Sequence, residues 1–253
     1  MFPKISAVLI VKNAEKTLLE CLQSLKYFDE IVILENGSTD NTLQVIESFK
    51  KKFQNIQVYT SEFIGFGPLK NLAISYAKNE WIFSIDSDEA LDEKSLGELE
   101  KIQWSEKNII AIPRKNLYGQ KWIKACGWYP DFVFRFFNKN FTRFNENLVH
   151  ESVILPQGSA IIHLKIPLKH YAYDNIAQLL GKMDKYSTLW AEQNVHKNNS
   201  IFKALLHAYW SFFRNYFLKK GVLYGYEGFI ISLCNALGVF FKYAKLYEKK
   251  KKL

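Results

Sequence analysis

The segment Trp81–Asp92, WIFSIDSDEALD, joins an apolar run to a dense group of acids. The run Trp81–Ile85 is typical of a strand that is buried on both faces of a parallel sheet. It ends at Asp86, and Asp88 and Glu89 follow almost at once. Carboxylates this close repel one another, so they must be hydrated, paired with basic groups or neutralised by a metal ion. The segment therefore predicts a strand that brings negative charge to one edge of a sheet.

The first hundred residues alternate between strand and helix patterns. Strands are predicted at 5–11, 30–36, 56–60 and 80–86, and helices at 14–25, 42–53 and 68–77. Apolar strands between amphipathic helices predict an α/β fold with a doubly wound, mostly parallel sheet. Ligands bind beyond the carboxyl ends of the strands in such a sheet. Three polar clusters follow strands and should converge there: KNAE (12–15), ENGSTDNT (35–42) and DSDE (86–89).

The pattern changes twice in the rest of the chain. Residues 109–168 form short aromatic-rich segments broken by Gly, Pro and Asn, with no helical period. After Tyr173 the pattern becomes helical, with one helix capped by Asp174 or Asn175 and a second beginning near Ser200. A third places apolar residues on one face: Phe229, Leu233, Leu237, Phe240 and Ala244. We therefore predict a domain of residues 1–173, in halves 1–108 and 109–173, followed by a C-terminal amphipathic and basic helical region, 174–253.

Composition restricts the class of protein. With 253 residues, 48% of them hydrophobic, the chain can bury a substantial core. Its three cysteines, Cys21, Cys126 and Cys234, are widely spaced in apolar sequence, which argues against zinc or a disulfide framework and favours a reducing compartment. The N-terminal apolar run fits a first strand better than a signal peptide. The longest uncharged run, Gly228–Phe241, is shorter than the roughly 18 apolar residues of a spanning helix.

The net charge of +9 belongs to the C-terminal end of the chain. From Lys197 onward, 11 Lys and Arg residues stand against Glu227 and Glu248, so the first 196 residues are neutral overall. The basic residues flank apolar helices and end in the run Lys249–Lys252, a combination that suits an anionic bilayer surface. Ordinary packing on the same domain is the alternative. No nucleic-acid-binding motif accompanies the charge, so we predict peripheral contact with a membrane and none with nucleic acid.

The motifs taken together resemble a known family. VKNAEKTLLECLQSL (11–25), ENGSTDNT (35–42), GFGPLKNLAI (65–74) and SIDSDEAL (84–91) look like an inverting family 2 glycosyltransferase of the GT-A fold. Segments 127–153 and 215–248 look like those of lipopolysaccharide core β-glucosyltransferases. The resemblance covers nearly the whole chain. It implies that residues 1–108 bind a nucleotide sugar and that residues 109–173 bind the acceptor.

For the nucleotide pocket, the resemblance implies a lining made by Val11, Lys12 and Asn13. Glu35 and Asn36 would lie near the uracil and the ribose. Glu35 stands where relatives more often carry Asp, which leaves the nucleotide preference open, although Asn36 could still read the base. The expected donor is a UDP-sugar.

For the metal, the resemblance implies that Asp86 and Asp88 form a D-x-D pair, with Asp88 the direct ligand and Lys70 beside the donor. Hard divalent cations prefer oxygen ligands and usually combine one or two carboxylates with substrate phosphates. The expected cofactor is Mg²⁺ or Mn²⁺, which would relieve the repulsion among the acids by bridging a diphosphate. A solvated acidic turn is the alternative interpretation.

Inverting transfer also needs a base that deprotonates the acceptor hydroxyl. Glu151, in NLVHES, follows where relatives carry their acidic base, and Asp131, in YPDF, is its rival. His150 is either structural or a metal or acceptor contact. Arg135 pairs either with the diphosphate or with a neighbouring acid.

The predicted function is therefore that of a hexosyltransferase. The expected donor is a UDP-hexose such as UDP-glucose, and the expected acceptor is a lipopolysaccharide or lipooligosaccharide core or another lipid-linked glycan. The predicted location is the cytoplasm, at the inner face of the cytoplasmic membrane. A sugar-phosphate nucleotidyltransferase is one alternative, although KNAEKT (12–17) lacks the glycine-rich loop that such an enzyme needs after its first strand. A non-catalytic membrane-binding module with a nucleotide-binding-like fold is the other.

Overall fold

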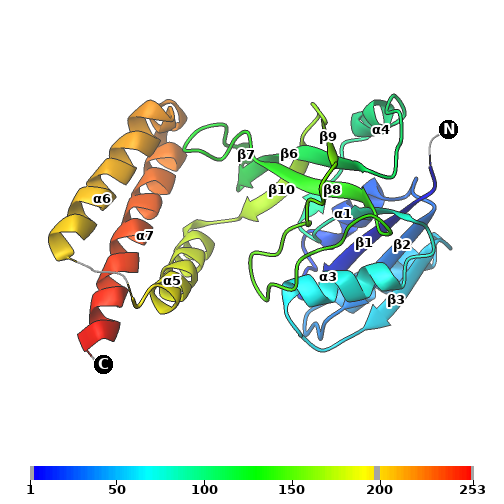
Figure 1. Ribbon diagram of the computed structural model, residues 1–253, viewed down its shortest axis with the longest axis horizontal. Helices are drawn as coiled ribbons and strands as arrows, with labels where there is room; N and C mark the ends of the chain where they lie inside the picture. Colours follow the sequence, from blue (N-terminus) through cyan, green and yellow to red (C-terminus); the bar gives the residue numbers. More distant parts are fainter. Residues whose placement is uncertain (1–2, 197–199, 252–253) are drawn as a thin grey trace. The chain divides into compact units, whose positions relative to one another are not determined.

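The computed structural model describes residues 3–196 and 200–251 (Figure 1). The chain forms two compact units. Unit 1 comprises Met1–Arg114 and Asp131–His170, and unit 2 comprises Lys115–Pro130 and Tyr171–Leu253. The excursion Lys115–Pro130 thus belongs with the C-terminal helices, while the division predicted after Tyr173 stays a prediction. Lys252 of the basic run lies outside the described residues.

All seven elements predicted in the first hundred residues are confirmed. They are β1 (Ile5–Val11), α1 (Leu18–Ser24), β2 (Glu30–Glu35), α2 (Thr42–Lys50), β3 (Ile56–Thr60), α3 (Phe66–Ser75) and β4 (Trp81–Ser84). The elements that follow are β5 (Glu89–Ala90), α4 (Lys94–Leu99), β6 (Asn108–Tyr118), β8 (Phe132–Asn138), β9 (Ala160–His163) and β10 (Leu168–Tyr173). The segment 109–168, predicted to lack helices, is built from strands and loops.

The strands form a sheet in the order β3-β2-β1-β4-β8-β6-β10-β5, with β9 also pairing with β6. The first four strands run parallel, and β8 then pairs antiparallel with both β4 and β6. This sheet, together with the C-terminal helices, confirms the predicted α/β fold. The carboxyl ends of β1, β2 and β4 lie at one edge, so the polar residues after each of them gather there.

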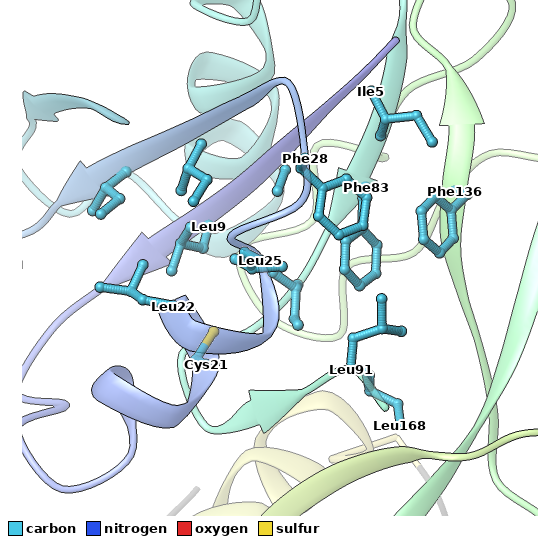
Figure 2. Packing of buried hydrophobic residues seen from close by; sticks show 14 of the residues in the cluster. Ile5, Leu9, Cys21, Leu22, Leu25, Phe28, Phe83, Leu91, Phe136 and Leu168 are labelled. Atoms are coloured by element: carbon cyan, nitrogen blue, oxygen red, sulfur yellow. The ribbon is translucent and has the colours of Figure 1, made fainter. Parts of the chain in front are cut away.

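The sheet of unit 1 is buried on both faces. Along β1 and β2, Leu9 and Ile33 pack into one hydrophobic cluster, while Val8 and Val32 pack into another, as the two-residue period of a strand requires. In the first cluster the ring of Phe83 stacks against those of Phe28 and Phe136 (Figure 2), with centroid distances of 5.2 and 4.1 Å. Helix α1 adds apolar residues to the same cluster, as Figure 2 shows for Leu22.

Unit 2 contains a short hairpin strand and the C-terminal helices. Its elements are β7 (Lys121–Trp122), α5 (Ile176–Gln193), α6 (Ile201–Phe213), the π-helix η1 (Arg214–Leu218), the 3₁₀ helix η2 (Gly221–Tyr224) and α7 (Gly225–Lys251). The predicted cap is confirmed, because the Asn175 side chain accepts a hydrogen bond from the Gln178 N–H at 3.1 Å. A small core joins the segment after β7 to α5 and α7 through Ile123, Leu179 and Ile231.

The long helix α7 is confirmed, but the face predicted to be apolar is not the buried one. Phe229 is 43% exposed, whereas Ile231 and Cys234 are buried. Among the described residues, the helical stretch Gly221–Lys251 is long and apolar enough to cross a membrane by length and composition. The uncharged run Gly228–Phe241 is only part of that stretch, which is why it alone falls short.

Candidate active site

The loops that follow β1 and β2 are joined by hydrogen bonds. Asn13, with a left-handed φ of 49°, donates its N–H to Ser38 Oγ at 3.0 Å and accepts from the Thr39 N–H at 2.8 Å. The expected convergence of these two polar clusters is therefore confirmed. Of the predicted nucleotide-pocket residues next to Asn13, Val11 has its side chain in the core and Lys12 is exposed.

Glu35 and Asn36 hold the loop that follows β2. Glu35 is buried, and its Oε1 accepts a hydrogen bond from the Ser38 N–H at 2.5 Å. Burial acts to raise the pKa of Glu35, but hydrogen bonds from Ser38 and from the N–H groups of Gly37 and Asn36 outweigh it and hold the pKa below its usual value. The Asn36 amide donates to the Ser61 carbonyl at 2.7 Å. Both side chains are thus fixed before any ligand arrives.

Asp86, just after β4, is paired with two cations. Lys70 Nζ, from α3, lies 2.9 Å from Asp86 Oδ1, and Arg135 Nη2, from β8, lies 2.5 Å from Oδ2. Burial alone would raise the pKa of Asp86, but the charges of Arg135 and then Lys70 hold it well below its usual value. Asp86 is therefore a carboxylate whose two oxygens are both engaged by protein cations.

Glu89 is the most deeply buried acid of the cluster. Its side chain is 0% exposed, and its Oε1 lies 2.5 Å from Arg135 Nη2 and 3.7 Å from Arg114 Nη1. Its Oε2 accepts the Asp86 N–H at 3.2 Å. Burial raises the pKa of Glu89 despite the opposing charge of Arg135. Arg135 is thus paired with acids of the protein, one of the two roles expected for it.

Both candidate bases are attached to this cluster. Glu151 Oε1 lies 2.9 Å from the same Lys70 Nζ that binds Asp86. Asp131 Oδ2 lies 2.6 Å from Arg114 Nη2 and 2.9 Å from Arg114 Nε. The result is a continuous ion-pair network in unit 1 of four acids and three bases: Glu151, Lys70, Asp86, Arg135, Glu89, Arg114 and Asp131. Pairing with basic residues thus offsets most of the repulsion among the carboxylates of the acidic segment.

Asp88 has a different environment from Asp86. Its side chain is 45% exposed, and His170 Nε2 lies 3.6 Å from Asp88 Oδ2. His170 was not foreseen from the sequence. It is brought there by β10, which pairs antiparallel with β5 and sets His170 opposite Glu89. A strand as short as β5 leaves no readable period, so no signal in the sequence connects residues this far apart.

A divalent cation fits these donors only if most of its ligands come from elsewhere. In residues 3–196 and 200–251 there is no group of three or more His, Cys, Asp or Glu side chains arranged for a metal. Asp88 supplies an exposed carboxylate beside the His170 imidazole, while both Asp86 oxygens are engaged. Mg²⁺ commonly takes one or two carboxylates and completes its shell with water and substrate phosphates. The residues present are compatible with that arrangement.

Helix α3 is fixed to the loop that precedes Glu151. The N–H of Phe66 donates to the Leu148 carbonyl at 3.1 Å, and the N–H of Gly67 donates to the Asn147 carbonyl at 3.0 Å. A Cβ at Gly67 would lie 2.1 Å from the Asn145 carbonyl oxygen, so this approach requires glycine. We call this contact the α3 clamp. It ties the helix that carries Lys70 to the loop that leads to Glu151.

Comparison with known families matches residues 6–157 to the model described as glycosyl transferase family 2. The chain belongs to glycosyl transferase family 2. The matched range contains every predicted site residue, from Val11 to Glu151, and ends before His170. Family membership confirms the resemblance found in the motifs and identifies the chain as a glycosyltransferase. The nucleotidyltransferase and the non-catalytic module are therefore not retained.

Several glycosyltransferases are similar to this chain over nearly its whole length. An uncharacterized glycosyltransferase of Rickettsia felis is 28% identical over 259 residues, covering 97% of this chain and 90% of its own. The lipopolysaccharide core biosynthesis glycosyltransferase LpsC of Rhizobium meliloti is 28% identical, covering 98% and 94%. Among solved structures, S. aureus TarS 1-349 in complex with UDP is 16% identical, with a TM-score of 0.49, covering 99% of this chain and 92% of its own.

Proposed function

We propose that this glycosyltransferase moves a hexose, glucose in the first instance, from a UDP-sugar to a lipopolysaccharide or lipooligosaccharide core or another lipid-linked glycan, with inversion at the anomeric carbon. The observation that carries the proposal is that Lys70 Nζ lies 2.9 Å from both Asp86 and Glu151. One cation thus joins the donor-side acid to the candidate base. The match to LpsC along nearly all of both chains supports a core glycan as the acceptor.

Glu151 is the proposed base. Lys70 binds Glu151 Oε1 and so orients the carboxylate. The second oxygen, Oε2, would then accept the proton of the acceptor hydroxyl as that hydroxyl attacks the sugar from the face opposite the leaving diphosphate. Asp131 is the weaker candidate, because both Nε and Nη2 of Arg114 converge on its Oδ2 in a charge-assisted pair.

Asp88, with His170 beside it, is the proposed site for Mg²⁺ or Mn²⁺. When bound, the ion would stabilise the negative charge that develops on the departing nucleoside diphosphate. Asp86 then has an indirect part, since it holds Lys70 and Arg135 in place next to the donor. Glu35, Asn36 and the loop from Val11 to Asn13 are the proposed nucleotide contacts.

The proposed location of the enzyme is the cytoplasmic side of the membrane, where a nucleotide sugar and a lipid-linked acceptor meet. Three features support it: the likeness to an enzyme of lipopolysaccharide core biosynthesis, the free and buried cysteines Cys21, Cys126 and Cys234, and the basic C-terminal helices. Free thiols are typical of a reducing compartment.

Glu151→Gln tests the base. It should keep its affinity for the UDP-sugar while transfer falls by about 10²-fold or more, the usual scale of a lost general base. Transfer is measured with a truncated core glycan isolated from a strain that lacks the enzyme, and Asp131→Asn is the matched control with a milder expected loss. If Asp131→Asn alone abolishes transfer with donor binding intact, the two roles must be exchanged.

Asp88→Asn tests the metal. Titration calorimetry with UDP-sugar should give weaker binding in EDTA than in Mn²⁺ for the wild type, and little difference between the two for Asp88→Asn. Equal wild-type affinity in both conditions would refute a metal that bridges protein and diphosphate.

A further inference from the structure

Helix α6 reverses the usual orientation of an amphipathic helix. The residues that it buries are the small ones, Ala204 and Ser211. Six large apolar residues are between 50% and 71% exposed: Ile201, Phe202, Leu205, Leu206, Tyr209 and Trp210. A soluble helix normally turns such residues toward the core. This exposed surface is the aromatic face of α6.

The aromatic face is one continuous side of the helix. At 100° per residue, the spacing of its members, in adjacent pairs four residues apart, places all of them on one half of the circumference. Ala204 and Ser211 lie on the opposite half, where α6 packs against α7. Lys203 is the only Lys or Arg of α6 and lies at the margin of the face, whereas His207 lies on the opposite half, where its ring stacks on that of Tyr243 in α7.

The apolar exposure continues through the turn that follows α6. Phe217, Leu218, Val222 and Leu223, from η1 and η2, are each at least 45% exposed. The Phe213 and Phe217 rings, 5.2 Å apart, connect the end of α6 to this turn. Contiguous exposed apolar surface on this scale marks a site of interaction with another molecule or with a membrane.

The charge beside this surface is of one sign. Between Ser200 and Tyr226 there is no Asp or Glu, while Lys203, Arg214, Lys219 and Lys220 are all exposed. Cations around an aromatic surface match a bilayer with anionic headgroups, where Trp and Tyr favour the interface and nearby Lys or Arg residues are attracted. A second copy of this chain fits poorly, because a two-fold dimer would set the same cations against one another.

The contacts of α7 favour a position on the bilayer rather than across it. Lys245 Nζ lies 2.6 Å from Asp184 Oδ1, and Lys249 Nζ lies 2.9 Å from Glu192 Oε1. Both acids belong to α5, which therefore covers α7 with charged groups. Helix α5 also packs along the uncharged run of α7, with Met183 beside Gly238. If α7 crossed the bilayer, α5 would carry its charged residues Lys182, Asp184 and Lys185 into hydrocarbon with it, where charges are costly.

We propose that α6, η1 and η2 insert their exposed apolar side chains into the interface of an anionic bilayer, with Lys203, Arg214, Lys219 and Lys220 against the lipid phosphates. This deepens the proposed function, on which it rests for the choice of membrane, by naming the surface that would hold the enzyme next to a lipid-linked acceptor. Vesicle binding requires neither donor nor acceptor, so the two proposals can fail separately.

The test is co-sedimentation of the full chain with phosphatidylcholine vesicles, with and without phosphatidylglycerol. The wild type should bind the anionic vesicles, and the triple variant Leu206→Ser, Tyr209→Ser, Trp210→Ser should bind them at least about tenfold more weakly, since interfacial binding scales with buried apolar area. A matched variant with three exposed apolar residues of unit 1 replaced, Tyr27→Ser, Ile154→Ser, Leu155→Ser, should bind like the wild type.

A second variant tests the charge. Lys203→Gln, Lys219→Gln and Lys220→Gln together should weaken binding to the anionic vesicles by about fivefold per charge removed, and high salt should weaken the wild type in the same sense. Transfer to a soluble glycan fragment, measured in parallel, should be unchanged in the aromatic-face variant and in the lysine variant, whose substitutions all lie in unit 2. It would report a misfolded variant, or a failure of the proposed function, independently of vesicle binding.

Three results would overturn the proposal. The first is a wild-type chain that does not bind anionic vesicles at low salt, and the second is an aromatic-face variant that binds them as well as the wild type does. The third is a wild-type dimer that the aromatic-face substitutions dissociate while vesicle binding stays absent, which would make a second copy the occupant.

Discussion

The ion-pair network of unit 1 and the aromatic face of unit 2 each reverse the usual distribution of side chains. The network buries charges: Lys70, Glu89 and Arg135 are 6%, 1% and 4% exposed. The aromatic face exposes hydrophobic groups, such as Tyr209 at 71%. In the network every buried charge has a partner of opposite sign within the same unit. The exposed apolar groups of α6 gain nothing comparable from their own unit.

This difference separates two kinds of functional surface. A buried charge is tolerated only when it is paired, and each buried charge of the network has its partner in the isolated chain, although Arg135 Nε has no hydrogen-bond acceptor among the described residues. The network is therefore organised before the substrate arrives. An exposed apolar face is tolerated in water but contributes only when something covers it. The ion-pair network is therefore suited to act on a bound substrate, whereas the aromatic face has an effect only when another molecule or a membrane covers it.

Arg135→Met should disrupt the ion-pair network and give the largest loss of stability among these variants. It leaves Asp86 and Glu89 without their shared cation, and removing one partner of a buried pair destabilises a fold by about 3–5 kcal/mol. Urea unfolding measures the change. Lys169→Met is the control, because its partly exposed pair with Glu20 should be worth about 1 kcal/mol or less. Equal losses of unfolding free energy in the two variants would show that the buried pairs of Arg135 contribute no more to stability than an exposed pair does.

Removal of Glu248–Leu253 tests how much the basic end of α7 adds to membrane binding by unit 2. The deletion removes four lysines and one acid. Binding to anionic vesicles should fall by about tenfold at low salt, which is less than the loss expected if all four lysines contacted the lipid surface. Lys249 is held by Glu192, which limits its part. The measurement is sedimentation across a salt series, and the difference from the wild type should shrink as salt rises. A difference that persists at high salt would assign the tail a structural part instead.

Glu35→Gln should give the smallest effect and shows how a paired acid depends on pH. Because the folded-state pKa of Glu35 lies below its usual value, its charge stabilises the fold above the unfolded pKa, near 4.5, and this contribution disappears as the pH falls through the folded pKa. We expect a loss of about 1 kcal/mol at pH 7 that closes under acid conditions. Unfolding curves for both proteins at several pH values measure it. A difference in unfolding free energy that is constant with pH would contradict a lowered pKa of Glu35 in the folded protein.

Much of unit 1 was predictable because its signals are local. The apolar run of β1 and the period of α2 are both contained in stretches shorter than a dozen or so residues, the range over which such patterns act. The relation of Lys70 to Asp86 and Glu151 depends on three separate segments, and the motifs indicated that they share a site without indicating that Lys70 binds both acids. Which of the predicted residues contact a nucleotide stays a prediction.

Long-range pairing and the choice of buried face were not predictable. His170 reaches Asp88 through the pairing of β10 with the very short β5, which has no pattern to recognise. In α7 the sequence favoured a face that includes Phe229, whereas the fold buries Ile231 and Cys234. Where large apolar residues occupy most sides of a helix, its period indicates that the helix exists but does not indicate which side meets the protein.

The α3 clamp has a consequence for how this enzyme can change over time. Gly67 lies directly against the backbone of Asn145, so Lys70 and the loop leading to Glu151 form one mechanical body. Any substitution of this glycine would require compensating changes in that loop, so the two segments are expected to change together during evolution. New acceptor preferences are then more accessible through substitutions on the surrounding strands than through lengthening or loosening this loop.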